Sequence, residues 1–302
     1  MMKAILLLAF GGPRSLDEIE PFLTRLMKGE KPSPEQLERV KERYCLIGGS
    51  SPLPEITSRQ AKALEKRLNS KGYLLQSYVG IRYGKPFIEE ALKEILQNGH
   101  REVFAIPMAP FRSRLSTNAY EEELNRANQI FGNRLKINFI EGWHSHPLFL
   151  RAIAEKVLEG LNHFPQEERK KVHLIFTAHS LPESAVSRDP YVVDMKESVE
   201  GVLKRITPLP WHMAFQSKGG GRERWIGPDI ESVLIELQKI NVKKVLVAPI
   251  GFVSDHIEIL YDVDILCREK AESMGIVLER TPSLNDSEQF IEALAAVMEE
   301  HL

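Results

Sequence analysis

The densest group of chemically capable side chains lies within residues 249–264, in the sequence PIGFVSDHIEILYDVD. Asp255, Glu258 and Asp262 follow one another at intervals of three and four residues, a spacing that places side chains on one face of a helix. His256 stands beside the first of these acidic residues. Carboxylates next to an imidazole suit a transiently held divalent cation or a proton relay.

The elements around this group favour a functional interpretation. The run Lys244–Ile250 is short, apolar and rich in β-branched residues, so it predicts a buried strand. We expect a helix to follow, capped by Ser254 or Asp255 and apolar at helical spacing as far as Leu266. The competing interpretation is a solvated acidic face, because like charges at this spacing repel. The position after a strand favours a ligand site, since open α/β sheets bind ligands at the carboxyl ends of their strands.

The same stretch closely resembles the signature of the ferrochelatases, which insert ferrous iron into a porphyrin. Three further segments carry the likeness: FTAHSLPE at 176–183, FQSKGGGRERWIGPD at 215–229 and PSLNDSEQFIEAL at 282–294. KPSPE at 31–35 and IGGSSPLPEIT at 47–57 are similar to the coproporphyrin-type ferrochelatases of Gram-positive bacteria. The resemblance covers nearly the whole chain, with motifs in both halves and in the expected order.

The resemblance implies roles for four residues. His179 and Glu258 match the family's opposed histidine and glutamate, which are expected to contact the metal and to accept protons from the porphyrin nitrogens. His256 and Asp262 match a nearby histidine and acidic residue, and would ligate metal or relay protons. Oxygen ligands hold ferrous iron weakly enough to release it to four porphyrin nitrogens. The division of metal delivery and proton removal between His179 and Glu258 stays open at this stage.

A second set of residues is expected to bind the porphyrin. Arg43, Ser51 and Tyr120 align by likeness with porphyrin-contacting positions, and Trp225 falls in the family's Q-S…W-x-G-P segment. Arg14 occupies a position where coproporphyrin-type enzymes often carry a tyrosine that can ligate product iron, which puts the axial ligand in doubt. Arg14 is expected to meet a substrate carboxylate instead. Further candidates are the apolar wall residues Phe111 and Phe252 and the cations Lys28, Arg112, Arg114 and Lys218.

The order of elements predicts an α/β fold made of two similar Rossmann-like halves. Each half is expected to hold a four-stranded parallel sheet flanked by helices, with a cleft between the halves at the carboxyl ends of the strands. The expected strands are Ala4–Phe10, Leu74–Arg82, Val103–Met108, Lys136–Ile140, Val172–Thr177, Trp211–Gln216, Lys244–Ile250 and Gly275–Arg280. We place an N-terminal domain at residues 1–143, a C-terminal domain with the catalytic motifs at 144–280, and at 281–302 a terminal helix that packs back on the first domain.

The composition of the chain indicates which partners and which cellular location to expect. The chain has 302 residues and a net charge of −2, which gives no support for nucleic-acid binding. Its two cysteines cannot form an iron–sulfur site, and a reduced cytoplasm is the expected location. No segment approaches the roughly 20 apolar residues of a membrane span. We expect porphyrin and ferrous iron as substrates, no resident cofactor, and at most transient contact with other haem-pathway proteins.

Two motifs resemble a nucleotide-binding loop and a metal site, and we interpret neither of them as such a site. The triple glycine at 219–221 lacks the spacing of a nucleotide-binding loop. His144 and His146 have a metal-like H-x-H spacing but lack a third ligand nearby in sequence, so we interpret them as loop residues. The alternatives to a ferrochelatase are a cobalt or sirohydrochlorin chelatase and a non-catalytic tetrapyrrole carrier.

Overall fold

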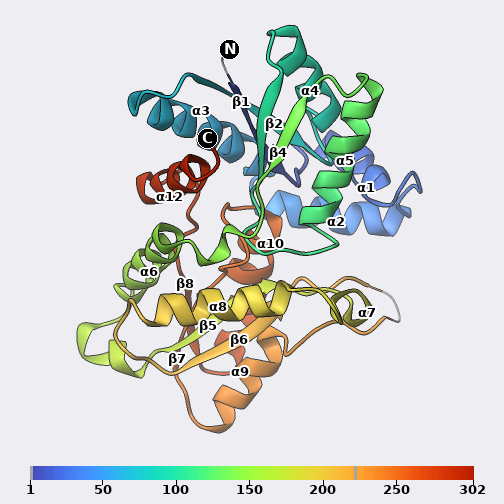
Figure 1. The fold of residues 1–302 in the computed structure, drawn as a ribbon. Helices are drawn as coiled ribbons and strands as arrows, with labels where there is room; N and C mark the ends of the chain where they lie inside the picture. The colour runs from blue at the N-terminus through green and yellow to red at the C-terminus, as the bar shows by residue number, and fades with distance from the viewer. Residues whose placement is uncertain (1–2, 221–222) are drawn as a thin grey trace.

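The computed structural model describes residues 3–220 and 223–302 as two four-stranded parallel sheets with helices on both faces of each (Figure 1). The first sheet consists of β1 (Lys3–Ala9), β2 (Leu75–Ile81), β3 (Glu102–Pro107) and β4 (Lys136–Phe139) in the order β2-β1-β3-β4. The second consists of β5 (His173–His179), β6 (Trp211–Gln216), β7 (Lys244–Ala248) and β8 (Val277–Arg280) in the order β6-β5-β7-β8. Both sheets therefore have the same topology, and all eight expected strands are confirmed.

Strand β1 shows why the sequence forms a buried parallel sheet. Its residues are almost all fully buried, and alternate side chains enter different clusters. Ile5 and Leu7 pack on the side of α3, whereas Leu6 and Leu8 pack on the side of α4 and α5. Parallel strands covered on both faces carry such unbroken apolar runs. The N-terminal apolar segment is thus an inner strand of the sheet, as predicted.

The helices of the first half precede or connect its strands. They are α1 (Ile19–Leu26), α2 (Pro34–Leu46), α3 (Leu53–Ser70), α4 (Ile88–Gln97) and α5 (Thr117–Ile130). In the second half they are α6 (Pro147–Leu161), α7 (Glu183–Val186), α8 (Tyr191–Leu203), α9 (Ile230–Lys239), α10 (Ile257–Leu260), a π-helix (Asp262–Cys267) and α11 (Arg268–Ser273). Among the described residues, no helix combines the length and apolarity needed to cross a bilayer.

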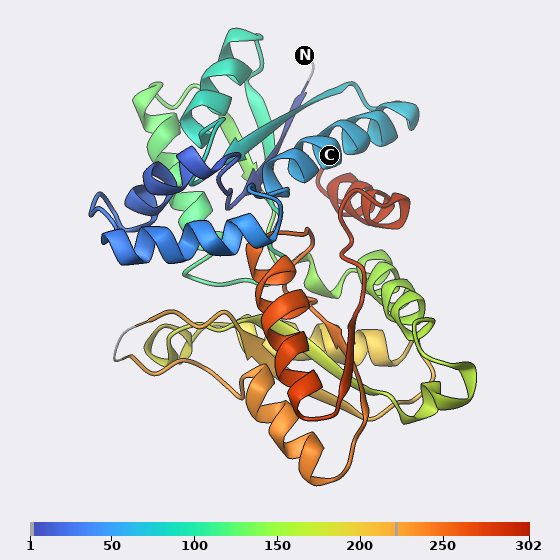
Figure 2. The ribbon, with the colours of Figure 1, turned by 180° about the vertical axis from the view of Figure 1, so that it is seen from behind.

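One apolar cluster joins the two halves. It contains α3 and β1 from the first half, α6 and α8 from the second, and the C-terminal helix α12 (Glu288–Glu299). Figure 2 shows α12 between α3 and α6, and Lys71, the C-cap residue of α3, pairs with Glu292 at 3.3 Å and Glu299 at 3.0 Å. The halves thus meet through a shared core. The division of the chain at residues 143 and 280 stays a prediction.

Candidate active site

His179 is the last residue of β5, at the carboxyl edge of the second sheet. Its Nδ1 faces the backbone oxygen of Ser180, which can only accept a hydrogen bond, so Nδ1 carries a proton. In the neutral ring, Nε2 therefore presents a lone pair. The hydroxyl of Tyr191 donates to the backbone oxygen of His179 at 3.0 Å, which fixes the strand end from the side of α8.

Glu258 comes from the segment after the neighbouring strand β7 and meets His179. Its Oε1 lies 3.4 Å from Nε2 of His179. Its backbone oxygen accepts a hydrogen bond from Nε2 of Gln216 at 2.9 Å, and Oε1 of Gln216 accepts one from the Thr177 hydroxyl at 2.6 Å. Gln216, the last residue of the edge strand β6, therefore ties the inner strand β5 to the backbone that carries Glu258.

The helix expected here is broken in the structure. His256, and not Ser254 or Asp255, occupies the N-cap position, and its side chain makes no capping bond. The four-residue helix α10 ends at Leu260 and a π-helix begins at Asp262. A π-helix inserts an extra residue into the hydrogen-bonding pattern, and such insertions are frequent at functional sites. Apolar spacing alone does not reveal the change of helix type.

The expected ridge of three carboxylates is wrong for Asp255. That residue precedes the helix, and its carboxylate turns away to accept hydrogen bonds from Ser283 at 2.6 Å and Asn285 at 2.8 Å. Two hydrogen-bond donors in the loop after β8 stabilise the Asp255 carboxylate in this orientation. An orientation beside Glu258 and Asp262 would instead bring like charges together. Asp262 accepts a hydrogen bond from the hydroxyl of Ser217. Of the three acidic side chains, only Glu258 contacts His179.

His256 approaches Glu258 from the other side. Its Nδ1 lies 2.9 Å from the backbone oxygen of Ser254, so its neutral ring also presents Nε2. This Nε2 lies 3.8 Å from Oε2 of Glu258, too far for a hydrogen bond. Oε2 is buried and has no hydrogen-bond partner among the described residues. Two imidazole nitrogens thus face one carboxylate, one of whose oxygens is unsatisfied.

The charges of this group are coupled. Burial alone would raise the pKa of Glu258, but the adjacent His179 and His256 lower it overall. Burial would lower the pKa of His179, and the Glu258 carboxylate reverses this effect, so that the pKa is raised. The pKa of Asp262 is raised, mainly by burial and further by the charge of Glu258. The site therefore combines a strongly ionised carboxylate with groups that exchange protons more readily.

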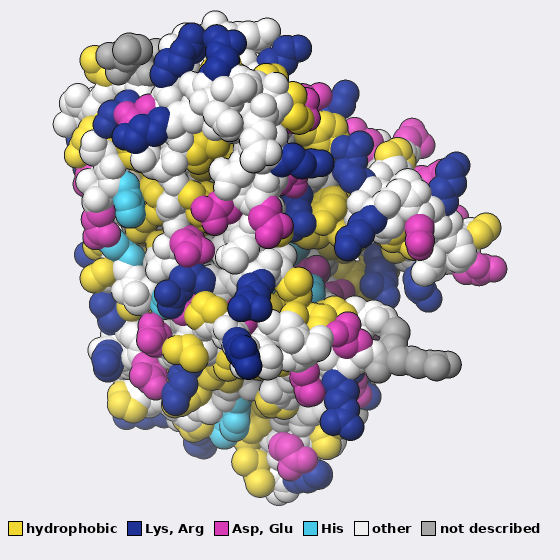
Figure 3. All heavy atoms as spheres, turned by 45° about the vertical axis from the view of Figure 1, so that its right-hand side comes forward, with side chains coloured by type: hydrophobic (Ala, Val, Ile, Leu, Met, Phe, Trp, Pro, Cys, Tyr) yellow, Lys and Arg dark blue, Asp and Glu magenta, His cyan; other side chains and the backbone are white. Residues whose placement is uncertain are grey.

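The group opens into a cleft between the two halves. This cleft encloses about 1090 Å³, part of it open to solvent, and is lined mainly by apolar side chains. Figure 3 shows a recess between the halves, with lysine and arginine side chains around its rim. His179, His256, Glu258 and Tyr120 line the cleft among the predicted site residues, together with the wall candidates Phe111 and Phe252. A largely apolar cleft with a few convergent polar groups is the usual form of a small-molecule site.

The remaining predicted porphyrin-binding residues lie around the cleft at varying distances. The ring of Trp225 is 6.5 Å from that of His179. Arg43 reaches across from α2 to stack over Tyr261 at 5.2 Å. Ser51 is buried. Arg14 is exposed, and its guanidinium donates to the backbone oxygen of Lys85 at 3.0 Å. The porphyrin-binding roles of these residues stay predictions.

The weaker cationic candidates differ in their surroundings. Arg112 forms a bidentate ion pair with the buried Asp194, at 2.6 and 3.0 Å, so its charge is already compensated. Lys218 pairs with Asp229 at 3.1 Å. Lys28 and Arg114 are exposed. The glycines of the rejected nucleotide motif lie partly outside the described residues, and Gly219 packs so closely against Trp225 that a Cβ would collide with the indole.

Sequence reasoning missed three residues of the site. Tyr191 lines the cleft and holds His179, and Gln216 holds Glu258. Arg82 is the only arginine or lysine that lines the cleft within the described part of the chain. Arg82 and Gln216 are each the last residue of a predicted strand, so the carboxyl-edge rule could have identified both. Tyr191 begins a helix, and no local pattern connects it to His179.

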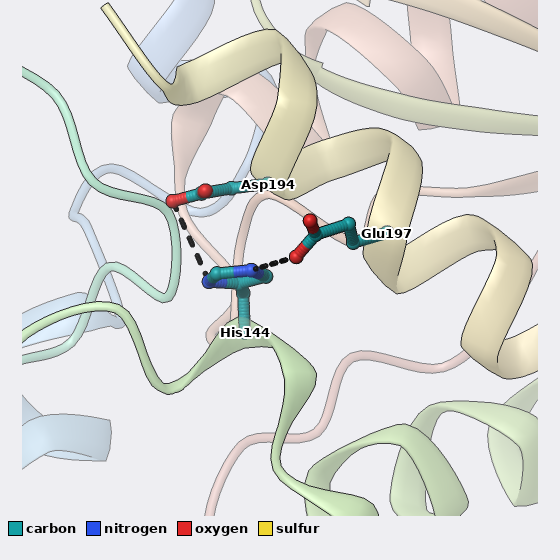
Figure 4. A group of neighbouring side chains, drawn as sticks. All are labelled: His144, Asp194 and Glu197. Carbon is teal, nitrogen blue, oxygen red and sulfur yellow. Dashed lines mark hydrogen bonds and ion pairs between the residues drawn. The ribbon is translucent and has the colours of Figure 1, made fainter.

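His144, the first histidine of the H-x-H motif, forms a different cluster with Asp194 and Glu197 (Figure 4). The ring of His144 lies between Asp194, 3.4 Å from Nδ1, and Glu197, 3.0 Å from Nε2. The two carboxylates face opposite nitrogens of one ring, and one ligand atom from each of the three residues lies within 4.8 Å of the others. Asp194 also accepts three hydrogen bonds from Arg112. His146 instead caps α6 by accepting from the Leu148 amide at 3.3 Å. His144 lies in a 3-10 helix (Trp143–Ser145) of the connection after β4, and the interpretation of both histidines as residues without a metal stays a prediction.

Solved structures define the class of fold. SirB from Bacillus subtilis, solved with Fe³⁺, superposes with a TM-score of 0.63 at 10% identity, covering 99% of this chain and 95% of that one. CbiX, described as the terminal enzyme of sirohaem biosynthesis in denitrifying bacteria, gives a TM-score of 0.55 at 13% identity and covers 99% of both chains. This likeness is one of fold, and the fold is that of the tetrapyrrole chelatases.

The sequence comparisons are more specific. The family model described as Ferrochelatase matches residues 2–302. A ferrochelatase of Deinococcus radiodurans is 38% identical over 298 residues, 98% of this chain and 94% of that protein. A coproporphyrin III ferrochelatase of Geobacillus sp. is 37% identical over 298 residues, 97% of this chain and 96% of that protein. The chain belongs to the ferrochelatase family, which makes it a lyase that inserts iron into a porphyrin in haem biosynthesis.

Proposed function

We propose that this enzyme inserts ferrous iron into coproporphyrin III at the cleft group formed by His179, Glu258 and His256. The observation that carries the proposal is the buried, unpartnered Oε2 of Glu258, which faces an imidazole nitrogen. A buried carboxylate oxygen without a partner is costly unless a cation or proton satisfies it. One carboxylate and neutral imidazoles form a ligand set that suits ferrous iron.

The residues divide the reaction between them. The porphyrin loses two pyrrole protons as Fe²⁺ loses its water ligands and enters the nitrogen plane. Glu258 and His256 hold the incoming ion, and Nε2 of His179 accepts the protons. Asp262 passes protons onward toward solvent, which the raised pKa of its carboxyl group favours. The net exchange of one dication for two protons transfers no electrons, so the proposed reaction needs no resident cofactor.

We expect the cleft to bind the macrocycle in a bent form. Porphyrin nitrogens accept a metal more readily when the ring is bent, and binding energy from remote parts of the substrate can support that strain. In our proposal, Trp225 and Phe252 contact the macrocycle face near His179. Tyr120, Ser51 and Arg43 meet its carboxylates, with Arg14 at the outer edge. Several relatives are named coproporphyrin III ferrochelatases, which supports the tetracarboxylic substrate over protoporphyrin IX.

The test is anaerobic turnover with ferrous iron, followed by loss of porphyrin fluorescence, with coproporphyrin III and protoporphyrin IX compared side by side. The proposal predicts a strong preference for coproporphyrin III. An equal rate or a preference for protoporphyrin IX would overturn the substrate assignment. Insertion of cobalt alone would indicate a corrin-type chelatase, and tight binding without insertion would indicate a carrier. The proposal places the reaction in the cytoplasm, supported by the free thiols of Cys45 and Cys267.

A further inference from the structure

The segment that carries His256 and Glu258 is attached at both ends to the loop that follows β8. This loop, residues 280–285, begins with Arg280 at the carboxyl end of the strand. Its backbone meets the segment directly, because the amide of Asn285 donates to the backbone oxygen of Val253 at 2.8 Å. The two stretches come from neighbouring strands, since β7 pairs with β8.

Arg280 binds the C-terminal end of the segment, at Asp264. Its Nε donates to Oδ1 of Asp264 at 2.7 Å, and its Nη2 donates to Oδ2 at 2.8 Å. This bidentate geometry needs the planar fork of a guanidinium, and a lysine cannot reproduce it. The Arg280 side chain is only 12% exposed, so solvent weakens the pair little.

The same loop binds the N-terminal end of the segment, at Asp255. Asp255 accepts hydrogen bonds from the Ser283 hydroxyl at 2.6 Å and from the Asn285 amide at 2.8 Å. Its own backbone N–H donates to Oδ1 of Asn285 at 2.9 Å. Nη1 of Arg280 donates to the Ser283 hydroxyl at 3.2 Å and lies 3.5 Å from the Asp255 carboxylate. One arginine therefore connects Asp255 with Asp264.

The residues between Asp255 and Asp264 need contacts from outside the segment to hold their conformation. A four-residue helix followed by a π-helix has little stability of its own, because helix nucleation is unfavourable and π-helical turns are rare. A metal site nevertheless requires its ligands to be held within about half an ångström. We propose that Arg280 is a positioning residue for the Glu258–His256 group, and that it holds the ends of the ligand-bearing segment at a fixed separation. This inference rests on the proposed function of that group.

The chain offers a matched control. Arg59 of α3 forms another bidentate arginine–aspartate pair with the neighbouring residue Asp286, at 2.9 and 3.1 Å. That pair connects the loop to the first half and does not touch the ligand-bearing segment. Arg280→Lys and Arg59→Lys thus weaken the same kind of contact, at the ligand-bearing segment in the first case and away from it in the second.

The experiment measures cobalt(II) binding to the whole protein without porphyrin, by the visible absorption of the ion, and iron insertion separately. Loss of a residue that orients metal ligands lowers metal affinity or activity by about 10- to 100-fold. We expect such a loss of cobalt affinity and of kcat in Arg280→Lys, with porphyrin affinity unchanged, and no loss in Arg59→Lys. Unchanged cobalt affinity and kcat in a folded Arg280→Lys protein would overturn the inference.

Ser283→Ala is the second variant, because it removes one hydroxyl and leaves the ion pair with Asp264 in place. If Arg280→Lys does not fold, weaker cobalt binding in a folded Ser283→Ala protein supports the inference, and unchanged binding refutes it. The cobalt measurement does not depend on turnover. Wild-type protein that binds cobalt but inserts no iron would therefore refute the proposed function while leaving the positioning role to be decided by the variants.

Discussion

Nε2 of His179 and Oε1 of Glu258 lie 3.4 Å apart, although they belong to separate βα connections. They meet because β5 and β7 are neighbours in the second sheet, so that their carboxyl ends share one edge. Each partner shifts the pKa of the other toward its charged form. The pair therefore acts as a unit, and removal of either member should affect the same chemical step.

Replacement of Glu258 by glutamine should abolish most metal insertion. The amide keeps the shape of the side chain but removes the charge that receives Fe²⁺ and raises the pKa of His179. We expect kcat to fall at least about 100-fold, because the ion loses a ligand and His179 loses the charge that supports its proton transfer, while porphyrin binding persists. Anaerobic turnover and fluorescence titration measure the two effects. Glu197→Gln, far from the cleft group, is the control, and near-normal turnover in Glu258→Gln would refute the assignment.

Replacement of His179 by alanine should also stop insertion while leaving porphyrin bound. The variant removes the Nε2 acceptor but keeps the strand end, because Tyr191 binds the backbone oxygen of residue 179. Loss of a general base lowers turnover by about 10²- to 10⁴-fold. If the role is proton removal, an added imidazole base should restore part of the rate. Turnover close to wild type in the alanine variant would contradict the role.

Gly251 lines the cleft where space for a side chain is missing. A Cβ there would lie 2.6 Å from the Cβ of Ala178 and 2.8 Å from its Cα, directly before His179. We expect Gly251→Ala to shift the end of β5, to lower stability by about 1–3 kcal/mol, and to reduce kcat. Thermal unfolding and turnover test this result. Gly220→Ala meets no atom within 4 Å and is the control. Wild-type kcat and stability in Gly251→Ala would show that the strand end tolerates the shift.

Much of the fold was predictable because its signals are local. Short β-branched runs such as Lys244–Ala248 are bounded by turn residues, and the helical stretches between them have clear apolar periodicity. The repeated alternation then implies parallel sheets, and the carboxyl-edge rule places the cleft. The terminal helix could be predicted, but its position between α3 and α6 depends on ion pairs across the whole chain, as between Lys71 and Glu292.

The site was predictable only in part. Motif likeness identified His179 and Glu258, and the sheet order brings them together. The sequence did not predict that Asp255 turns away, because its partners Ser283 and Asn285 lie in another connection. Nor did it predict the π-helix at Asp262, whose inserted residue shifts the helical register. Leu266, expected on the apolar face of a regular helix, is 42% exposed. Contacts between distant segments decided each point.

Asp194 should be the most sensitive acidic residue for stability outside the cleft. It is fully buried and accepts three hydrogen bonds from Arg112, which joins the wall of the cleft to α8. The Arg112 side chain left behind is 43% exposed, so the cost is that of the lost hydrogen bonds, about 1–3 kcal/mol. We expect Asp194→Ala to show that loss in chemical denaturation. Glu197→Gln, at a side chain that is itself 55% exposed, should change stability by about 1 kcal/mol or less. Equal effects of the two substitutions would contradict this explanation.

His173 and His212 predict how stability depends on pH. Their rings meet edge to edge at the start of β5 and β6, with Nδ1 of His173 3.1 Å from Nε2 of His212. Such a hydrogen bond needs one nitrogen to donate and the other to accept, so two protonated rings cannot share it. Burial lowers the pKa of both groups, and the charge of His212 lowers that of His173 further.

The sign of the effect follows from these lowered pKa values. Above the unfolded-state pKa of about 6.5, both states are neutral and the contribution to stability is complete. As the pH falls from there through the lower folded-state pKa, the unfolded chain binds more protons than the folded one, so stability is lost. Denaturant unfolding from about pH 8 to pH 5 should therefore show a smaller loss in His212→Gln than in wild type. His301→Gln, at an exposed site, should keep the wild-type dependence. Identical pH profiles for wild type and His212→Gln would show that the pair does not titrate as its geometry requires.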